Sequence, residues 1–195
     1  MKSNVCKIEN GSKDLNAIFR ESEKVAVYNE LSHKQSLQLR LLCEEIDGML
    51  PRIIDDFDGD LWIEFENGVC KVNLSIRFAE FSPEKKADLV AIAKNKKNAA
   101  ATGIVGKIRS AVENFFLSDD VVQSLAATAS AFRTAGYDDC TRNWSLEQYR
   151  SSVKKSAKTE DWDELEKSVI ASVADDVIVG VKGNTASIVI VKNFA

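Results

Sequence analysis

The sequence has little of what many catalytic centres use. His33 is the single histidine among 195 residues, and it lies where a helix is expected to begin, so a histidine-based catalytic triad is not expected. The four cysteines are far apart and form no CxxC pair; they are Cys6, Cys43, Cys70 and Cys140. Such spacing argues against a zinc site and is typical of reduced thiols that fill a core in a cytoplasmic protein.

Long apolar runs are missing as well. No stretch approaches the ~20 apolar residues that a membrane-spanning helix needs, and the first residues lack the apolar run of a signal peptide. The net charge of −4 gives no general attraction to nucleic acid or to an anionic membrane. Because 45% of the residues are apolar and 29% are charged, we expect one folded cytoplasmic domain, residues 1–195, that binds neither nucleic acid nor membrane.

Two β-hairpins give the clearest local signals. Residues 61–66 and 69–78 alternate between apolar and polar side chains around Asn67-Gly68, a dipeptide that favours a type I′ turn. The buried side of this hairpin is expected to carry Val72, Leu74 and Ile76. A second hairpin is expected at the end of the chain, turning near residues 182–184, and a short strand is expected at residues 5–8.

Helical periodicity predicts helices that begin near residues 14, 32, 82, 107, 121, 144 and 161. The second of these starts with Ser32 and Gln35, a capping box. Its apolar side is expected to include Leu37, Leu41 and Leu42, with Leu39 and Cys43 widening the apolar stripe. Helices and antiparallel strands follow one another without a βαβ rhythm. The fold class is therefore α+β: a two-layer sandwich of a mixed or antiparallel sheet of four to six strands, with helices on one face.

Charged residues are distributed unevenly along the chain. Glu44, Glu45 and Asp47 interrupt the apolar side of the second helix, either as a solvated face or as the edge of a cleft. Residues 44–66 are rich in acids, whereas residues 84–109 are rich in Lys and Arg. This asymmetry is consistent with two solvated faces, with complementary docking, or with an anion site in the basic part, where residues 102–108 form a turn that leads into a helix.

The order of the expected elements resembles that of the histidine-kinase-like ATPase fold, also called the GHKL or Bergerat fold, and is most similar to its anti-sigma-factor serine-kinase branch. That family carries LxLxEExxxN on a helix, in which the second Glu acts on a water or hydroxyl and the Asn holds magnesium. The stretch LRLLCEEIDGM is similar, and the resemblance makes Glu45 the catalytic residue. Met49 stands at the Asn position, although a thioether is a poor ligand for Mg²⁺; Asp47 could offer an oxygen two positions earlier.

The other two motifs of the family match less of the chain. Its adenine-reading DxGxG has no counterpart here beyond Glu80, the one acid near that place. Its Gly-rich turn beside the phosphates is similar to the stretch at 102–108, so the resemblance implies that ATP phosphates would lie at Thr102, Gly103, Gly106 and Lys107. The resemblance covers about residues 12–118 and 164–195, with a helical insertion at about 119–163.

Three functions are compatible with these observations. The first is a non-catalytic or weakly nucleotide-binding regulatory protein, which uses an ATPase-like scaffold to bind another protein as anti-sigma factors do. The second is an active ATP- and Mg²⁺-binding protein or serine kinase of the same fold, with unusual ligands. The third is an unrelated α+β interaction domain, in which these acids and glycines are ordinary surface and turn residues.

Overall fold

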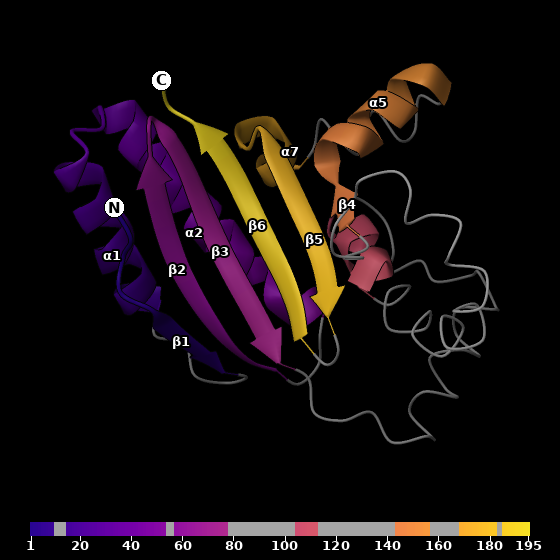
Figure 1. The fold of residues 1–195 in the computed structure, drawn as a ribbon, viewed down its shortest axis with the longest axis horizontal. Helices are drawn as coiled ribbons and strands as arrows, with labels where there is room; N and C mark the ends of the chain where they lie inside the picture. The colour runs from indigo at the N-terminus through magenta and orange to yellow at the C-terminus, as the bar shows by residue number, and fades with distance from the viewer. Residues whose placement is uncertain (10–14, 54–56, 78–103, 113–142, 157–167, 183–184) are drawn as a thin grey trace, which may run out of the picture.

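A computed structural model describes residues 1–9, 15–53, 57–77, 104–112, 143–156, 168–182 and 185–195 (Figure 1). The strands are β1 (Cys6–Glu9), β2 (Asp58–Glu66), β3 (Val69–Arg77), β4 (Asn143–Ser145), β5 (Asp176–Lys182) and β6 (Thr185–Asn193). The helices are α1 (Leu15–Tyr28), α2 (His33–Ile53), α5 (Leu146–Ser156) and α7 (Val169–Val173), and residues 104–112 are helical as well. Within these ranges no helix has both the length and the apolarity to cross a membrane.

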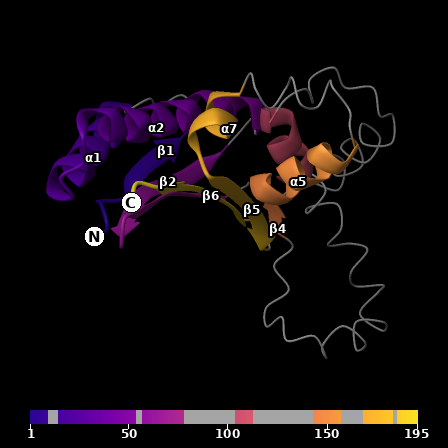
Figure 2. The same ribbon diagram turned by 90° about the horizontal axis from the view of Figure 1, so that it is seen from above.

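The strands form one sheet in the order β1-β2-β3-β6-β5-β4, and every neighbouring pair is antiparallel. Helices α1, α2 and α7 lie over one face of this sheet (Figure 2). As far as the chain is described, no helix covers the opposite face. The expected α+β class, with an antiparallel sheet and its helices on one side, is therefore confirmed.

Both predicted hairpins are present. Asn67 and Gly68 have φ angles of 52° and 79°, the positive values that a type I′ turn needs. In β3 the residues Val72, Leu74 and Ile76 are buried, as the alternation predicts. At the second hairpin Lys182 pairs with Thr185, which leaves a two-residue connection at 183–184.

The turn between α1 and α2 follows from local hydrogen bonds. Leu31 N donates to Ala26 O at 2.9 Å and Glu30 N donates to Val27 O at 3.2 Å, which is the Schellman pattern at the end of a helix. Glu30 takes the left-handed conformation of that motif, with φ 53°. The capping box then begins α2, because Ser32 N donates to Gln35 Oε1 at 2.8 Å and Gln35 N donates to Ser32 Oγ at 3.4 Å.

The buried side of α2 is not quite the one predicted. Leu37 is 52% exposed, Leu41 is half-buried and Leu42 is fully buried. The residues of α2 that enter the core are Leu39, Leu42, Cys43, Ile46, Met49, Leu50 and Ile53. The expected burial of Leu39, Leu42 and Cys43 is confirmed, whereas the first turn of α2, with Leu37, lies outside the core.

The prediction that a helix begins at Trp144 is wrong. Residues 143–145 form β4, which pairs with β5 at the edge of the sheet, and α5 begins only at Leu146. The segment expected as a helical insertion therefore adds a strand to the sheet. The helices expected from residues 82 and 121, and the first part of the helix expected from 161, lie outside the described residues.

Helix α5 is fixed to its surroundings by a carboxylate, a hydroxyl and a guanidinium. Asp176 Oδ1 accepts from Glu147 N at 3.0 Å and Ser145 Oγ accepts from Gln148 N at 3.2 Å, so both cap the first turn. The Arg150 guanidinium donates to three backbone carbonyls where α7 ends and β5 begins, those of Ala171, Ala174 and Asp175. These bonds hold α5 against β5 and α7.

Candidate functional site

The first half of the predicted nucleotide site lies on α2. Glu44 is exposed and Glu45 is half-buried, so neither residue belongs to the apolar core. Asp47 belongs to α2, although its side chain is not described. Met49 is only 2% exposed and packs in the apolar core with Ile46 and Leu50.

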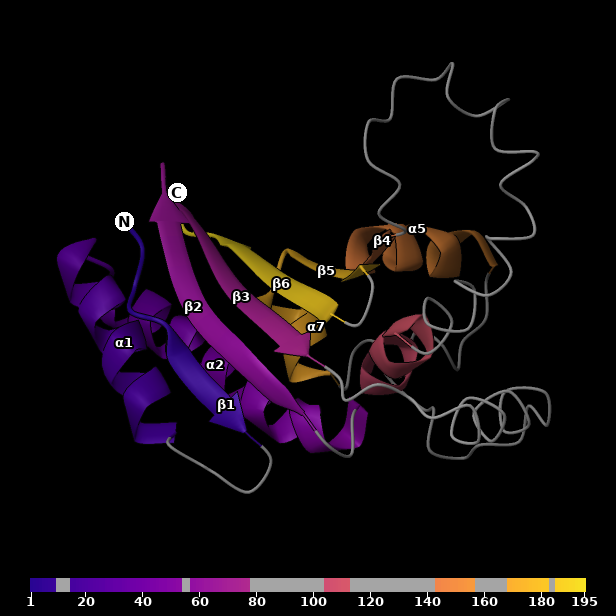
Figure 3. The ribbon, with the colours of Figure 1, turned by 60° about the horizontal axis from the view of Figure 1, so that its bottom comes forward.

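The second half of that site lies at residues 102–107. Gly106 is buried within the helical segment 104–112, and Lys107 Nζ lies 5.3 Å from the centre of the Tyr149 ring. Thr102 and Gly103 are outside the described residues. This segment lies between the C-terminal end of α2 and α5, so Ile104 and Ile108 share the core with Met49 (Figures 2 and 3). The described part of the second half, the helical segment 104–112, thus lies beside the C-terminal end of α2.

Thiol and metal chemistry find little support in the described ranges. Burial raises the pKa of Cys70 to about 12, and burial together with the neighbouring Cys70 and Cys6 raises the pKa of Cys43. Burial therefore keeps both thiols protonated at neutral pH, which disfavours either of them as a nucleophile. Over those same ranges no group of three His, Cys, Asp or Glu residues is placed to hold a metal ion.

A different site lies at the edge of the sheet, between α1 and residues 1–9, the segment that ends in β1 and is called the N-terminal strand below. A groove of about 670 Å³ runs there, and its two walls are consecutive residues of the strand and one face of the helix. The strand side consists of Asn4, Val5, Cys6 and Lys7, and the helix side of Ala17, Arg20, Glu21 and Lys24.

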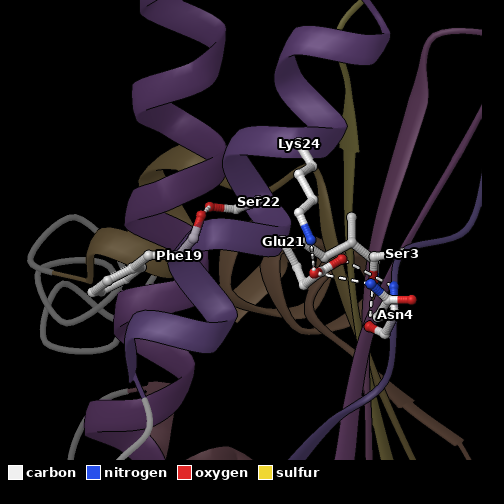
Figure 4. Close-up of polar contacts among 7 residues, drawn as sticks. Ser3, Asn4, Phe19, Glu21, Ser22 and Lys24 are labelled. Carbon is white, nitrogen blue, oxygen red and sulfur yellow. Dashed lines mark hydrogen bonds and ion pairs between the residues drawn. The ribbon is translucent and has the colours of Figure 1, made fainter.

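Glu21 is the most constrained group of this groove (Figure 4). Its side chain is 11% exposed, and Lys24 Nζ lies 2.6 Å from its Oε1. Asn4 donates to the same carboxylate twice, from its backbone N–H at 3.0 Å and from Nδ2 at 3.1 Å. The hydrogen bond from Lys24 first, and then the bonds from Asn4, lower the pKa of Glu21 despite its burial. The carboxylate therefore remains charged and joins α1 to the strand.

The backbone explains why Asn4 needs this partner. Lys2 is paired with Glu64 and Cys6 with Leu61, so four steps along the first strand face three steps along β2. The extra residue is a β-bulge, which turns one amide away from the sheet. Glu21 accepts that amide, so the bulge and the buried carboxylate form one structural unit.

Further ion pairs lie beside the groove. Lys7 Nζ is 2.6 Å from Asp60 Oδ1, and Arg77 contacts both Asp60 and Asp58. The hydrogen bond from Lys7, followed by that from Arg77, lowers the pKa of Asp60. Lys7 thus holds its ammonium group at Asp60, and the residue also lines the groove.

Sequence reasoning did not identify the groove or Glu21. Glu21 reads as one of several charged residues on the polar side of a helix, and nothing local connects it with Asn4, seventeen positions away. Its periodicity offered a weak signal, since Ala17, Glu21 and Lys24 recur at helical spacing on one face.

The chain matches no protein-family model, no curated protein and no solved structure. The functional argument accordingly depends on the chain's own geometry.

Proposed function

We propose that this protein is a cytoplasmic regulatory protein that acts by binding another protein and that it binds nucleotide weakly or not at all. In this proposal the scaffold is of the histidine-kinase-like ATPase type and the mode of action is like that of anti-sigma factors. Neither nucleic acid nor membrane is a partner. The buried free thiols of Cys6, Cys43 and Cys70 suit a reducing compartment.

The observation that carries the proposal is the distribution of exposed apolar side chains. In the described ranges, the exposed large apolar residues all belong to the first 37 positions: Met1, Val5, Val27, Tyr28 and Leu37. Val27 is 79% exposed and Tyr28 73%, and both end α1, whereas Leu37 lies in the first turns of α2. Aromatic and aliphatic groups left in water at one helical hairpin favour a protein-binding surface.

The environment of Met49 supports the non-catalytic part of the proposal. At the position where the resembling family has a magnesium-binding Asn, this chain has a thioether that packs among apolar side chains. Mg²⁺ needs oxygen ligands in near-octahedral geometry, and Met49 supplies none. The helical segment 104–112, which contains Lys107, lies beside the C-terminal end of α2 (Figures 2 and 3), and weak nucleotide binding is the second candidate function.

Site-specific photo-crosslinking tests the protein-binding part. A photoreactive phenylalanine analogue in place of Tyr28 is expected to give a defined protein adduct in the cells that make this protein. The same analogue in place of Lys154, an exposed residue of α5, is the matched control. Identical adducts from the two positions, or none from either, would overturn the proposal.

Calorimetry tests the nucleotide part. When ATP and Mg²⁺ are titrated into the protein, we expect no binding with a Kd tighter than about 1 mM. We expect Met49→Asn to restore little, because the adenine-reading motif is missing as well. A micromolar Kd for the wild type that is lost in Glu45→Ala would instead establish the ATP-binding alternative.

A further inference from the structure

The side of α2 that faces away from the sheet carries four positions at helical spacing, called the α2 ridge below (Figure 2). They are Leu37, Leu41, Glu44 and Gly48, which follow one another by four, three and four residues and therefore lie on one face. Leu37 is 52% exposed, Leu41 is half-buried, and Glu44 and Gly48 are exposed. None of them belongs to the hydrophobic core, whose α2 residues lie on the opposite face of the helix.

Gly48 leaves a notch at one end of the α2 ridge. A Cβ atom built there would have no atom within 4 Å beyond the nearby backbone of its own helix, so an alanine would fit without a clash. Glycine inside a helix is destabilising relative to alanine, and one use that offsets this cost is the close approach of another molecule. Because α2 continues to Ile53, no turn requires this glycine. The notch therefore suits a side chain from a second protein molecule.

The charges of α2 are divided between its two halves. Residues 33–43 contain two cations, Lys34 and Arg40, and no acid, whereas residues 44–53 contain three acids and one arginine. With histidine neutral, the two halves thus carry net charges of +2 and −2. Two α2 helices that run antiparallel place each basic half against an acidic half, whereas a parallel pair would place like charges together. The helix is therefore complementary to a second copy of itself.

We propose that two copies of this chain associate through their α2 ridges, which cross in antiparallel orientation. Leu37 and Gly48 are eleven residues apart, so Leu37 of each copy fills the notch at Gly48 of the other. This alignment brings the two Leu41 side chains together at the centre and places Arg40 of each copy beside Glu44 of the other. The inference goes beyond the proposed function, because the occupant of the ridge is a second copy and not a different protein.

Arg40 is free to exchange its partner for one on the second copy. Within one chain, Arg40 Nη1 lies 3.5 Å from Glu23 Oε1, and the guanidinium carbon lies 4.7 Å from the centre of the Phe19 ring. The side chains of Arg40 and Glu23 are 49% and 63% exposed, and an ion pair so exposed contributes little to stability. Turning Arg40 toward Glu44 of a second copy therefore costs the single chain little.

Sedimentation equilibrium of the purified full chain tests the association. Because one pair of helices buries less area than a standard protein–protein interface, we expect a Kd of about 10–100 μM. The measured mass should rise from 21.6 kDa toward twice that value as the protein concentration increases, and added salt should reduce the rise. A mass that stays at 21.6 kDa up to a chain concentration of about 1 mM would overturn the proposal.

Two charge reversals locate the contact. Arg40→Glu places a carboxylate beside Glu44 of the other copy, and Glu44→Arg places a second cation beside Arg40, so each variant alone should associate at least about tenfold more weakly. An equimolar mixture of the two variants should associate about as well as the wild type, because each reversed charge then meets an opposite charge. Wild-type association of either variant alone, or a mixture that does not recover, would overturn the antiparallel contact.

A further variant decides the question if a charge reversal prevents folding. Gly48→Gln fills the notch with a good helix former, so it should raise the melting temperature by about 2 °C and yet weaken association about tenfold. Ser151→Gln adds similar bulk at an exposed position of α5 and should leave association unchanged. Equal association of the two variants would overturn the role of the notch. All these measurements use the purified chain alone, so their outcome does not depend on the other protein to which the proposed function refers.

Discussion

At one edge of the sheet, β1 lies beside α1 with a groove between them, whereas at the other edge β4 runs directly into α5. Each edge uses a carboxylate to accept an amide of a neighbouring segment: Glu21 accepts from Asn4, and Asp176 accepts from Glu147. At β4 the helix continues the strand, and its first residue, Leu146, is fully buried. At β1 the helix approaches from the side. The groove thus lies at the edge where strand and helix are separate segments.

The largest effect on stability is expected in α2, which contributes seven residues to the hydrophobic core. Leu42→Ala should lower the free energy of unfolding by about 2–5 kcal/mol, because Leu42 is fully buried. Leu41→Ala, one position away and half-buried, should cost about 1 kcal/mol. Denaturant unfolding of the two variants measures the difference. Equal losses would mean that the orientation of α2 is wrong.

At the β4 edge, removal of the Arg150 guanidinium should have the next largest effect. Arg150→Ala leaves three carbonyls without their charged donor, and we expect a loss of about 1.5–3 kcal/mol. Arg150→Lys keeps the charge but cannot bridge three acceptors, so it should recover part of the loss. Thermal melting of both variants checks this order, and an unchanged melting temperature for Arg150→Ala would contradict it.

At the β1 edge, Glu21→Ala should destabilise by about 1–2 kcal/mol, because the amide and side chain of Asn4 lose their acceptor. The loss is expected to be smaller than that of Arg150→Ala, since the freed groups lie next to the groove and can reach water. Hydrogen exchange should also accelerate at the Asn4 amide and not in β4. Acceleration at both edges would show global destabilisation instead.

The lowered pKa of Glu21 makes the stability of the fold depend on pH. The folded-state pKa lies below the ordinary value of 4.5, so the charged carboxylate stabilises the fold above about pH 4.5. That contribution is lost as pH falls through the folded pKa, because the unfolded chain then binds more protons until both states are protonated. The stability difference between the wild type and Glu21→Gln should therefore shrink between pH 7 and pH 3. Glu147→Gln, an exposed carboxylate on α5, is the matched control.

The smallest effect is expected in the turn that joins α1 to α2. Glu30 has φ 53°, a conformation that costs a side chain-bearing residue about 1 kcal/mol relative to glycine. Glu30→Gly should stabilise the fold by about 0.5 kcal/mol, because part of that gain is offset by the freer unfolded chain. Glu30→Val should destabilise it. A loss of stability in Glu30→Gly would indicate that the Glu30 side chain makes a contact of its own.

Sequence reasoning predicted the elements whose signals are local. The Asn67-Gly68 turn, the alternation of β3 and the capping box of Ser32 and Gln35 each lie within a few residues, and each is present. It did not predict β4, since three residues are too few to show alternation and their pairing depends on β5. A helix start was expected there because Leu146 and the residues after it are helix-compatible.

The two candidate sites differ in the same way, because one was suggested by a local motif and the other depends on contacts between residues distant in sequence. A motif on α2 drew attention to Glu45 and Met49, yet a motif does not show which way a side chain points, and Met49 points into the core. The groove at β1 depends on Glu21 meeting Asn4 across the chain and on a bulge that appears only when two strands are paired. Such long-range coincidences leave no pattern in a single sequence.

The pairing of β3 with β6 has a consequence for how the chain reaches its native state. Within each hairpin the strands are neighbours in sequence, but Arg77 must find Thr185 across the longest connection between adjacent strands in the sheet. Closing so long a loop costs entropy before its contacts form, so this seam should assemble after the two hairpins. A destabilised chain would then populate an intermediate in which both hairpins are formed and the edges of β3 and β6 are unpaired. Aggregation would begin at these central strands and not at the edge strands β1 and β4.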